Sequence, residues 1–288
     1  MSHAEGYILN SGGMMIKFKC LCGKKILSII FVLFMPLVAY GVPFSSDVII
    51  NGSITFDSTN SSVAGTTQSG SISSLVSGAS TSSSISGTTL TGTNPLSGAL
   101  TDLGDGFGSA FYMSGNQNGD AGALYSDYAF NINNNSLTDQ YLIRFNIGFS
   151  NFVNADGSDA YVDGQLTLMN AMSLSELFFT DLTSDVLFGD KENGTNLASF
   201  GASLLDTGNV SLDIVLNPLG NFDLSGLNAL EAGVFDSVSR FNGTLSSFIS
   251  VSSVENLTNT GPPAGVPAPS TLYLMAIGLL GLLIRRKR

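Results

Sequence analysis

The stretch that decides the fold is Tyr141-Leu142-Ile143-Arg144-Phe145-Asn146-Ile147-Gly148-Phe149. Its large apolar side chains recur at every second position, which places them on one face of an extended chain. Arg144, Asn146 and Gly148 take the other face. This alternation predicts a half-buried strand of an antiparallel sheet, with one face on the core and the other in water.

Several other segments alternate in the same way or are rich in β-branched and aromatic residues. Turn-forming Gly, Asn, Asp and Ser residues separate them at short intervals. Residues 174–179 fit either a strand or a short helix, and residues 227–238 are similarly ambiguous. The predicted strands are residues 48–56, 107–113, 124–132, 141–152, 161–169, 210–216 and 248–254.

Two turns are predicted from local composition. Residues 151–157 contain Asn154, Asp156 and Gly157 and are expected to close the strand that begins at Tyr141. Residues 190–194, Asp-Lys-Glu-Asn-Gly, are expected to form a hairpin loop between strands at residues 186–188 and 197–200.

The body of the chain is expected at residues 42–259. No helical spacer in it is long enough for βαβ units, and no repeat recurs at a fixed period, so we predict an all-β fold, an antiparallel β-sandwich or jelly roll. Residues 58–94 carry no charge, and 26 of these 37 residues are Ser, Thr or Gly. They form either a flexible linker or strands with small outward residues. Residues 260–265 are a linker rich in Gly and Pro.

The N-terminal region is typical of an export signal. An apolar run at residues 26–38 ends before Ala39-Tyr40-Gly41, which supplies small residues at the signal-peptidase positions. We therefore predict a signal helix at residues 14–41 that signal peptidase recognises at Ala39 and Gly41 and cleaves after Gly41. The alternative is an uncleaved membrane anchor. Residues 1–13 are a misannotated or cloned extension if translation begins at Met14 or Met15. The basic residues before the apolar run are Lys17, Lys19, Lys24 and Lys25.

Cleavage at this site restricts the available chemistry. Cys20, Cys22 and His3 all lie upstream of it, and the chain has no Trp, so the mature protein has no Cys, His or Trp. Disulfides, histidine general-base chemistry and the usual zinc ligand sets are thereby excluded. The body has three basic and 21 acidic residues, a net charge of about −18, which disfavours nucleic acid and anionic lipid as partners.

Two kinds of carboxylate chemistry are considered. Asp156, Asp159 and Asp163 lie within eight residues and could bind calcium through oxygen ligands, although a solvated hairpin tip is the alternative. No other cofactor is expected. A glycoside hydrolase would need two carboxylates across a cleft, and no pair stands out from the sequence. The glutamates of the body are Glu176, Glu192, Glu231 and Glu255.

The C-terminal segment combines a proline turn, a short apolar run and a basic end. Pro267 and Pro269 mark the start of an expected helix. Residues 272–284 carry no charge but are shorter than the ~20 residues that span a bilayer. The basic residues 285–288 would stay cytoplasmic. An ordinary C-terminal anchor fits these features.

The same residues resemble the PEP-CTERM sorting domain, also called an ice-binding-protein C-terminal domain. The resemblance covers residues 266–288; Ala268 stands where the family has Glu. It implies recognition by an exosortase, a membrane protease-transpeptidase, after transient insertion in the inner membrane of a Gram-negative bacterium. Many such bacteria make exopolysaccharide, which is a candidate partner. The sorting-signal residues are Val266, Pro267, Ala268, Pro269, Ser270, Thr271, Arg285, Arg286, Lys287 and Arg288.

These observations lead to three functional hypotheses. The first is an exported, non-enzymatic protein of the cell surface or biofilm matrix, sorted through its tail. The second is an extracellular carbohydrate-binding protein or glycoside hydrolase on the same β-sandwich. The third is a surface protein that stays anchored and is never processed.

Overall fold

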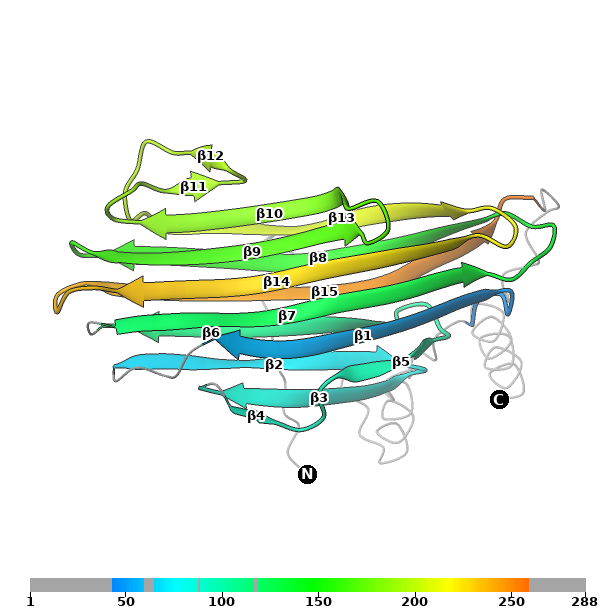
Figure 1. Ribbon diagram of the computed structural model, residues 1–288, viewed down its shortest axis with the longest axis horizontal. Coiled ribbons are helices and arrows are strands. Elements are labelled where there is room, and N and C mark those ends of the chain that lie inside the picture. Colours follow the sequence, from blue (N-terminus) through cyan, green and yellow to red (C-terminus); the bar gives the residue numbers. More distant parts are fainter. Residues whose placement is uncertain (1–42, 60–64, 88, 117–118, 259–288) are drawn as a thin grey trace, which may run out of the picture. The chain divides into compact units, whose positions relative to one another are not determined.

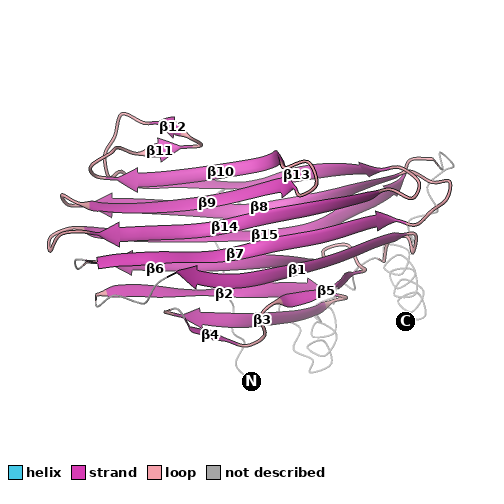
Figure 2. Ribbon diagram, in the orientation of Figure 1, coloured by secondary structure: helices cyan, strands magenta, loops and turns pink. Residues whose placement is uncertain are grey.

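The structure is a computed structural model that describes residues 43–59, 65–87, 89–116 and 119–258. The chain divides into two units, Met1–Tyr40 and Gly41–Arg288, and every described residue belongs to the second. All regular structure in this part is β-strand (Figure 2), and it holds no helix that could cross a membrane. The predicted N-terminal signal helix and the predicted hydrophobic helix of the C-terminal tail lie outside the described residues.

The described strands form two sheets (Figure 1). Every neighbouring pair of strands is antiparallel, which confirms the all-β, antiparallel prediction. The eight-stranded sheet has the order β12 (Thr195–Asn196), β11 (Lys191–Glu192), β10 (Ser175–Asp185), β9 (Ala160–Asn170), β14 (Asn221–Val234), β7 (Gly119–Asn134), β1 (Val48–Thr59) and β5 (Leu96–Leu100). The seven-stranded sheet has the order β13 (Leu204–Leu216), β8 (Tyr141–Asp156), β15 (Arg240–Asn256), β6 (Gly106–Gly115), β2 (Thr66–Val76), β3 (Ala79–Ser86) and β4 (Thr89–Thr91).

The two sheets face each other across one hydrophobic core. In β8, the alternation read from the sequence places Tyr141, Ile143, Phe145 and Ile147 inward, each at most 3% exposed. The Phe145 ring lies 5.4 Å from that of Phe130 in β7, so the sheets meet through an edge-to-face aromatic pair. Burial of each such side chain contributes about 1.5–3 kcal/mol, and the two inner faces therefore hold the sandwich together.

A buried polar cluster crosses the centre of this core. The Tyr128 hydroxyl of β7 lies 2.9 Å from Ser109 Oγ on β6 and 2.8 Å from Ser247 Oγ on β15. Ser126 Oγ and Asn228 Nδ2 both donate to Ser109 Oγ, at 2.8 and 2.7 Å. Burial raises the pKa of Tyr128, so its hydroxyl stays protonated. The hydroxyl groups satisfy one another and link the two sheets by hydrogen bonds.

The turn predicted at residues 151–157 is wrong in position. β8 continues to Asp156, and Asn151 and Ala155 keep the inward alternation with no exposed surface. The chain turns at Gly157, whose φ of 107° favours glycine. The polar Asn151 interrupts the apolar alternation, so the sequence does not indicate that the strand continues. In the structure, Asn151 can occupy an inward position because its Nδ2 group donates to the Gly164 carbonyl oxygen of β9.

The hairpin predicted around residues 190–194 exists, but its strands are wrong. They are β11 and β12, whereas residues 186–188 and 197–200 are not strands. Asn193 and Gly194 have φ values of 49° and 73° and form the tip, as expected of an Asn-Gly pair in a two-residue hairpin turn. Asp190 fixes the surrounding loop, because its carboxylate accepts three backbone N–H groups.

The segments left ambiguous by the sequence are mostly strand. Residues 175–179 form the first part of β10, and residues 227–234 lie in β14, whereas residues 235–238 belong to the turn before β15. Most of the described residues 58–94 form β2, β3 and β4, which excludes the linker alternative for them. Ile72 and Ile85 are 0% and 3% exposed, so sparse apolar residues cover the core, while most Ser and Thr side chains of β3 face outward.

Candidate binding site on the eight-stranded sheet

The outer face of the eight-stranded sheet carries a row of small side chains across the strands. Ser53 of β1 pairs with Ala129 of β7, and Ala129 pairs with Ser225 of β14. On its other side, Ser53 pairs with Ser97 of β5. Directly opposed residues point to the same face, so the row forms the floor of a depression. With strands about 4.8 Å apart, this floor is about 14 Å long.

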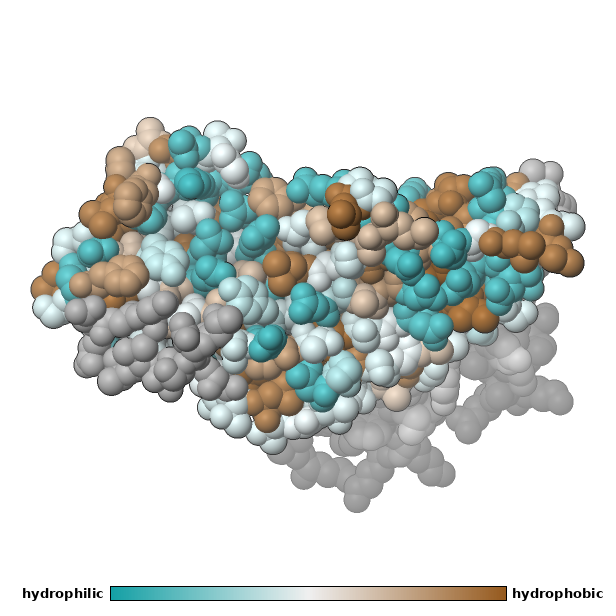
Figure 3. Space-filling view, viewed as in Figure 1, coloured by the Kyte–Doolittle hydropathy of each residue, from teal (hydrophilic) through white to brown (hydrophobic). Residues whose placement is uncertain are grey.

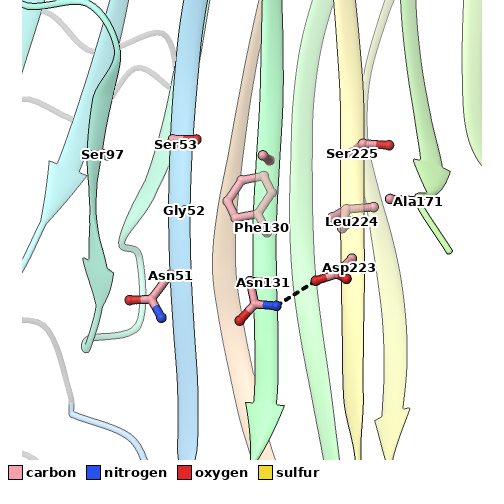
Figure 4. A pocket seen from close by; sticks show the side chains of 11 residues that line it. Asn51, Gly52, Ser53, Ser97, Phe130, Asn131, Ala171, Asp223, Leu224 and Ser225 are labelled. Carbon is pink, nitrogen blue, oxygen red and sulfur yellow. Dashed lines mark hydrogen bonds between the residues drawn. The ribbon is translucent and has the colours of Figure 1, made fainter.

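Longer polar side chains border the floor two residues further along the strands. Asn51, Asn131 and Asp223 form this border, and Asn131 Nδ2 donates to Asp223 Oδ1 at 2.6 Å. Figure 4 shows these three side chains in one row, a step along the strands from Ser53 and Ser225. The hollow that these residues line has a volume of about 480 Å³.

A second hollow adjoins the first at Ser225, which lines both. Its volume is about 350 Å³, and it lies over Leu227 of β14, which pairs with Asp127 of β7 and Thr167 of β9. Gln165 Nε2 donates to Thr167 Oγ1 at 2.9 Å. We call the two hollows together the trough, a depression bordered by amide, hydroxyl and carboxylate groups.

The trough has an acidic border and, among the described residues, no Lys or Arg in its lining. Arg144 and Arg240 form ion pairs on the seven-stranded sheet, and Lys191 lies in β11. Partial burial, reinforced by Asp57, raises the pKa of Asp127. From this side the surface is a mosaic of hydrophilic and neutral residues with separate hydrophobic patches (Figure 3). Such a site suits a neutral polyhydroxyl or a cationic ligand and disfavours an anion.

A second acidic group lies on the same face. Asp163 of β9 is directly opposite Glu231 of β14 and Thr183 of β10, and Thr183 Oγ1 donates to Asp163 Oδ2 at 2.8 Å. Burial, together with Asp181 and Glu231, raises the pKa of Asp163 to about 6. A carboxyl group with such a pKa can exchange a proton near neutral pH. Neither hollow of the trough is lined by Asp163 or Glu231.

The trough geometry favours binding over two-carboxylate hydrolysis. Its two acidic residues, Asp127 and Asp223, lie on neighbouring strands and are offset by four residues, because Asp127 pairs with Leu227. At about 3.4 Å per residue, this offset is about 14 Å along the sheet. Retaining and inverting glycosidases place their carboxyl groups about 5 to 10 Å apart. The four glutamates of the body lie on different strands outside the trough lining: Glu176 on β10, Glu192 on β11, Glu231 on β14 and Glu255 on β15.

The three aspartates predicted to bind calcium are not brought together. Asp156 ends β8 on the seven-stranded sheet and pairs with Arg240 at 2.6 Å, whereas Asp163 lies on the eight-stranded sheet. Asp159 lies in the intervening turn, where its backbone N–H donates to Ser239 Oγ. In the described ranges, no group of three or more His, Cys, Asp or Glu side chains is arranged to hold a metal ion. Calcium binding stays a prediction to which these positions give no geometric support.

The trough is not predictable from the sequence. Its floor depends on which residues of β1, β7 and β14 stand opposite one another, and sequence periodicity does not give strand pairing. The one available signal was the combination of small and amide residues at outward positions of predicted strands, such as Ser53, Ala129 and Asn131.

Comparison with known proteins identifies the C-terminal tail. Residues 265–288 match the PEP-CTERM protein-sorting motif. This range includes all the predicted sorting residues and lies outside the described part of the structure. A tail of this kind implies export across the inner membrane and sorting by exosortase to the cell surface or the extracellular space.

No curated protein matches the chain with significance. Among solved structures, the chain resembles infectious bursal disease virus of the Gt strain, with 9% identity over 83% of this chain and 75% of the viral chain and a TM-score of 0.18. It also resembles the VP2 subviral particle of that virus, with 8% identity over 80% and 72% of the two chains and the same TM-score of 0.18. TM-scores this low carry no argument about fold or function.

Proposed function

We propose that the protein is a non-enzymatic component of the cell surface or biofilm matrix, released from the inner membrane by exosortase. The observation that carries this proposal is a sorting motif attached to an antiparallel β-sandwich that has no His or Cys after the predicted signal cleavage site. Such a body can persist outside the cell as a stable module, and its net charge of about −18 keeps it soluble.

A carbohydrate-binding role is the second candidate, and the trough supports it. Amide groups can donate to and accept from the hydroxyl groups of a sugar, and carboxylates can accept from them. The absence of basic residues from the trough lining favours a neutral polysaccharide. A floor about 14 Å long exceeds one sugar ring and fits a short stretch of a chain. The candidate partner is the exopolysaccharide of the bacterium that produces the protein, because the exported protein would meet it outside the cell.

One experiment tests both proposals on the exported protein recovered from its host. The protein is incubated with neutral and anionic polysaccharides, including the host's own, while new reducing ends and binding are measured. We expect no turnover. Reproducible turnover that a single Asp or Glu substitution abolishes would overturn the non-enzymatic proposal.

The binding arm uses two trough variants and one matched control. We expect Asn131→Ala and Asp223→Asn to weaken binding of a neutral polysaccharide about fivefold or more, because the first removes an amide group and the second replaces an acceptor oxygen by a donor. Asn242→Ala, an exposed position of β15 on the other sheet, should leave binding unchanged. Equal binding by all three variants would refute the trough as the carbohydrate site and leave the sorting proposal intact.

A further inference from the structure

The two sheets have four edges, and three of them end in short strands. These are β12, β5 and β4, with two, five and three residues. Short edge strands themselves present few unpaired backbone groups, although β11 pairs with β10 only at Leu182 and Thr183 and leaves the start of β10 without a strand neighbour on that side among the described residues. The fourth edge is β13, which has 13 residues. Within the described part of the chain its one strand neighbour is β8, so alternate N–H and C=O groups along β13 point away from the sheet.

β13 has few of the features that usually protect a long edge, although Asp206 places one charge on its inward row. Its pairing with β8 runs in continuous register from Leu204 to Leu216, without a bulge. Its sequence contains no Pro, Lys or Arg, the residues that commonly interrupt edge-to-edge pairing. The edge therefore offers an uninterrupted template for another strand.

Apolar side chains are exposed along this edge. Leu205 and Val215 on the outer face are 66% and 54% exposed. Val210 belongs to the inward row that continues to Ile214, yet it is 37% exposed, whereas Ile214 is 4% exposed. Residues of this inward row are covered near the end of β13 but not at its middle. A partner at this edge would remove apolar surface from water at three points.

We propose that β13 pairs with β13 of a second copy of this chain, antiparallel about a two-fold axis at Val210. The two seven-stranded sheets would then continue into one another through main-chain hydrogen bonds. The two-fold axis fixes the cross-strand pairs as Leu204 with Leu216, Leu205 with Val215, Asp206 with Ile214, Thr207 with Asp213, Gly208 with Leu212, Asn209 with Ser211, and Val210 with its own copy.

The sequence of β13 is self-complementary in this register. The exposed Leu205 and Val215 meet each other on both sides of the axis, and Val210 is covered by its own copy. No two carboxylates stand directly opposite, and Asp213 keeps its 2.6 Å ion pair with Arg144 on β8. A shift of the register by two residues in either direction places Leu205 and Val215 opposite polar residues. The unshifted register is thus favoured by cross-strand contacts.

Charge makes the association depend on salt. Each body carries a net charge of about −18, so two copies repel each other at low ionic strength. Salt screens this repulsion over about 10 Å at 0.1 M, whereas the hydrogen bonds and apolar contacts of β13 are little affected. The dimer should therefore strengthen as sodium chloride increases.

Sedimentation of the exported protein, recovered from its host, tests this proposal. We expect the wild type to dimerise in 0.5 M sodium chloride and to dissociate on dilution into low salt. Val210→Lys and Val210→Asp should each raise the dimer dissociation constant about tenfold or more, because like charges meet at the axis. An equimolar mixture of the two variants should dimerise again, since opposite charges then meet at position 210.

Val238→Lys is the matched control, because Val238 is 75% exposed in the turn between β14 and β15, away from β13. It should dimerise as the wild type does. A wild type that stays monomeric at high salt overturns the proposal, and so does a dimer that Val210→Lys leaves intact. Failure of the mixed variants to dimerise overturns the two-fold axis at Val210.

Discussion

Replacing Asp163 by asparagine tests the electrostatics of the eight-stranded sheet. Burial and the nearby Asp181 raise the pKa of Asp163 from 3.8 to about 6. One pKa unit corresponds to about 1.4 kcal/mol, so the ionised carboxylate opposes folding by about 3 kcal/mol. Asparagine has nearly the same shape and can still accept the hydroxyl of Thr183, which donates to Asp163 at 2.8 Å.

The sign of the pH dependence follows from the raised pKa. The folded protein binds the Asp163 proton more tightly than the unfolded chain, so this stabilising contribution is complete below pH 4 and is lost as the pH rises through about 6. We therefore expect Asp163→Asn to match the wild type at pH 4 and to be more stable by up to about 3 kcal/mol at pH 7.5. The corresponding rise in melting temperature is about 6–12 °C for a domain of this size.

Thermal and urea unfolding of the exported protein between pH 4 and pH 7.5 measures this difference. Asp236→Asn is the control, since it removes the same charge from an exposed carboxyl. Hydrogen bonds from Ser158 and Ser239 lower the pKa of Asp236 to about 2, so this variant should lose stability at pH 7.5. Equal stability of Asp163→Asn and the wild type at pH 7.5 would refute the reasoning. Stabilisation by both variants would assign the effect to net charge alone.

Two further predictions concern the core and the N-terminus. Tyr128→Phe should lower the free energy of unfolding, measured in urea, by about 1–2 kcal/mol, because it removes the hydroxyl that joins Ser109 and Ser247. The control Tyr112→Phe, on the outer face of β6, should change this free energy little. Equal effects of the two substitutions would contradict a specific role for the buried cluster. The first residue of the exported protein should be Val42, because small residues occupy positions 39 and 41; mass spectrometry that finds residues 26–38 still attached would show an uncleaved anchor.

Strands with strict alternation were predictable because burial of one face imposes period two on the sequence. β8 and β9 show this clearly, and Ile143, Phe145, Val162 and Leu166 point inward as the pattern requires. Where a polar residue occupies an inward position, the pattern fails. The strand predicted at residues 141–152 stops short of Asp156, because Asn151 is a residue type typical of turns, although its buried amide donates to a carbonyl oxygen of the opposite sheet.

Strand pairing could not be predicted, and both proposed surfaces depend on it. The trough exists because Ser53, Ala129 and Ser225 stand opposite one another on strands that are far apart in the sequence. The edge position of β13 likewise follows from the order of strands in the sheet, not from its own residues. The local sequence predicts which segments are strands and which side chains face inward, whereas the packing of the whole body determines which strands are neighbours.

The most direct test of the sorting account is the C-terminal peptide of the protein recovered from its native host. Residues 265–288 match a motif that exosortase processes, and the apolar run at residues 272–284 is short for a permanent anchor. We predict that mass spectrometry of surface-located or released protein finds β15 but no peptide from residues 272–288. An intact C-terminus through Arg288 on surface-located protein would contradict the account and support a permanently anchored protein.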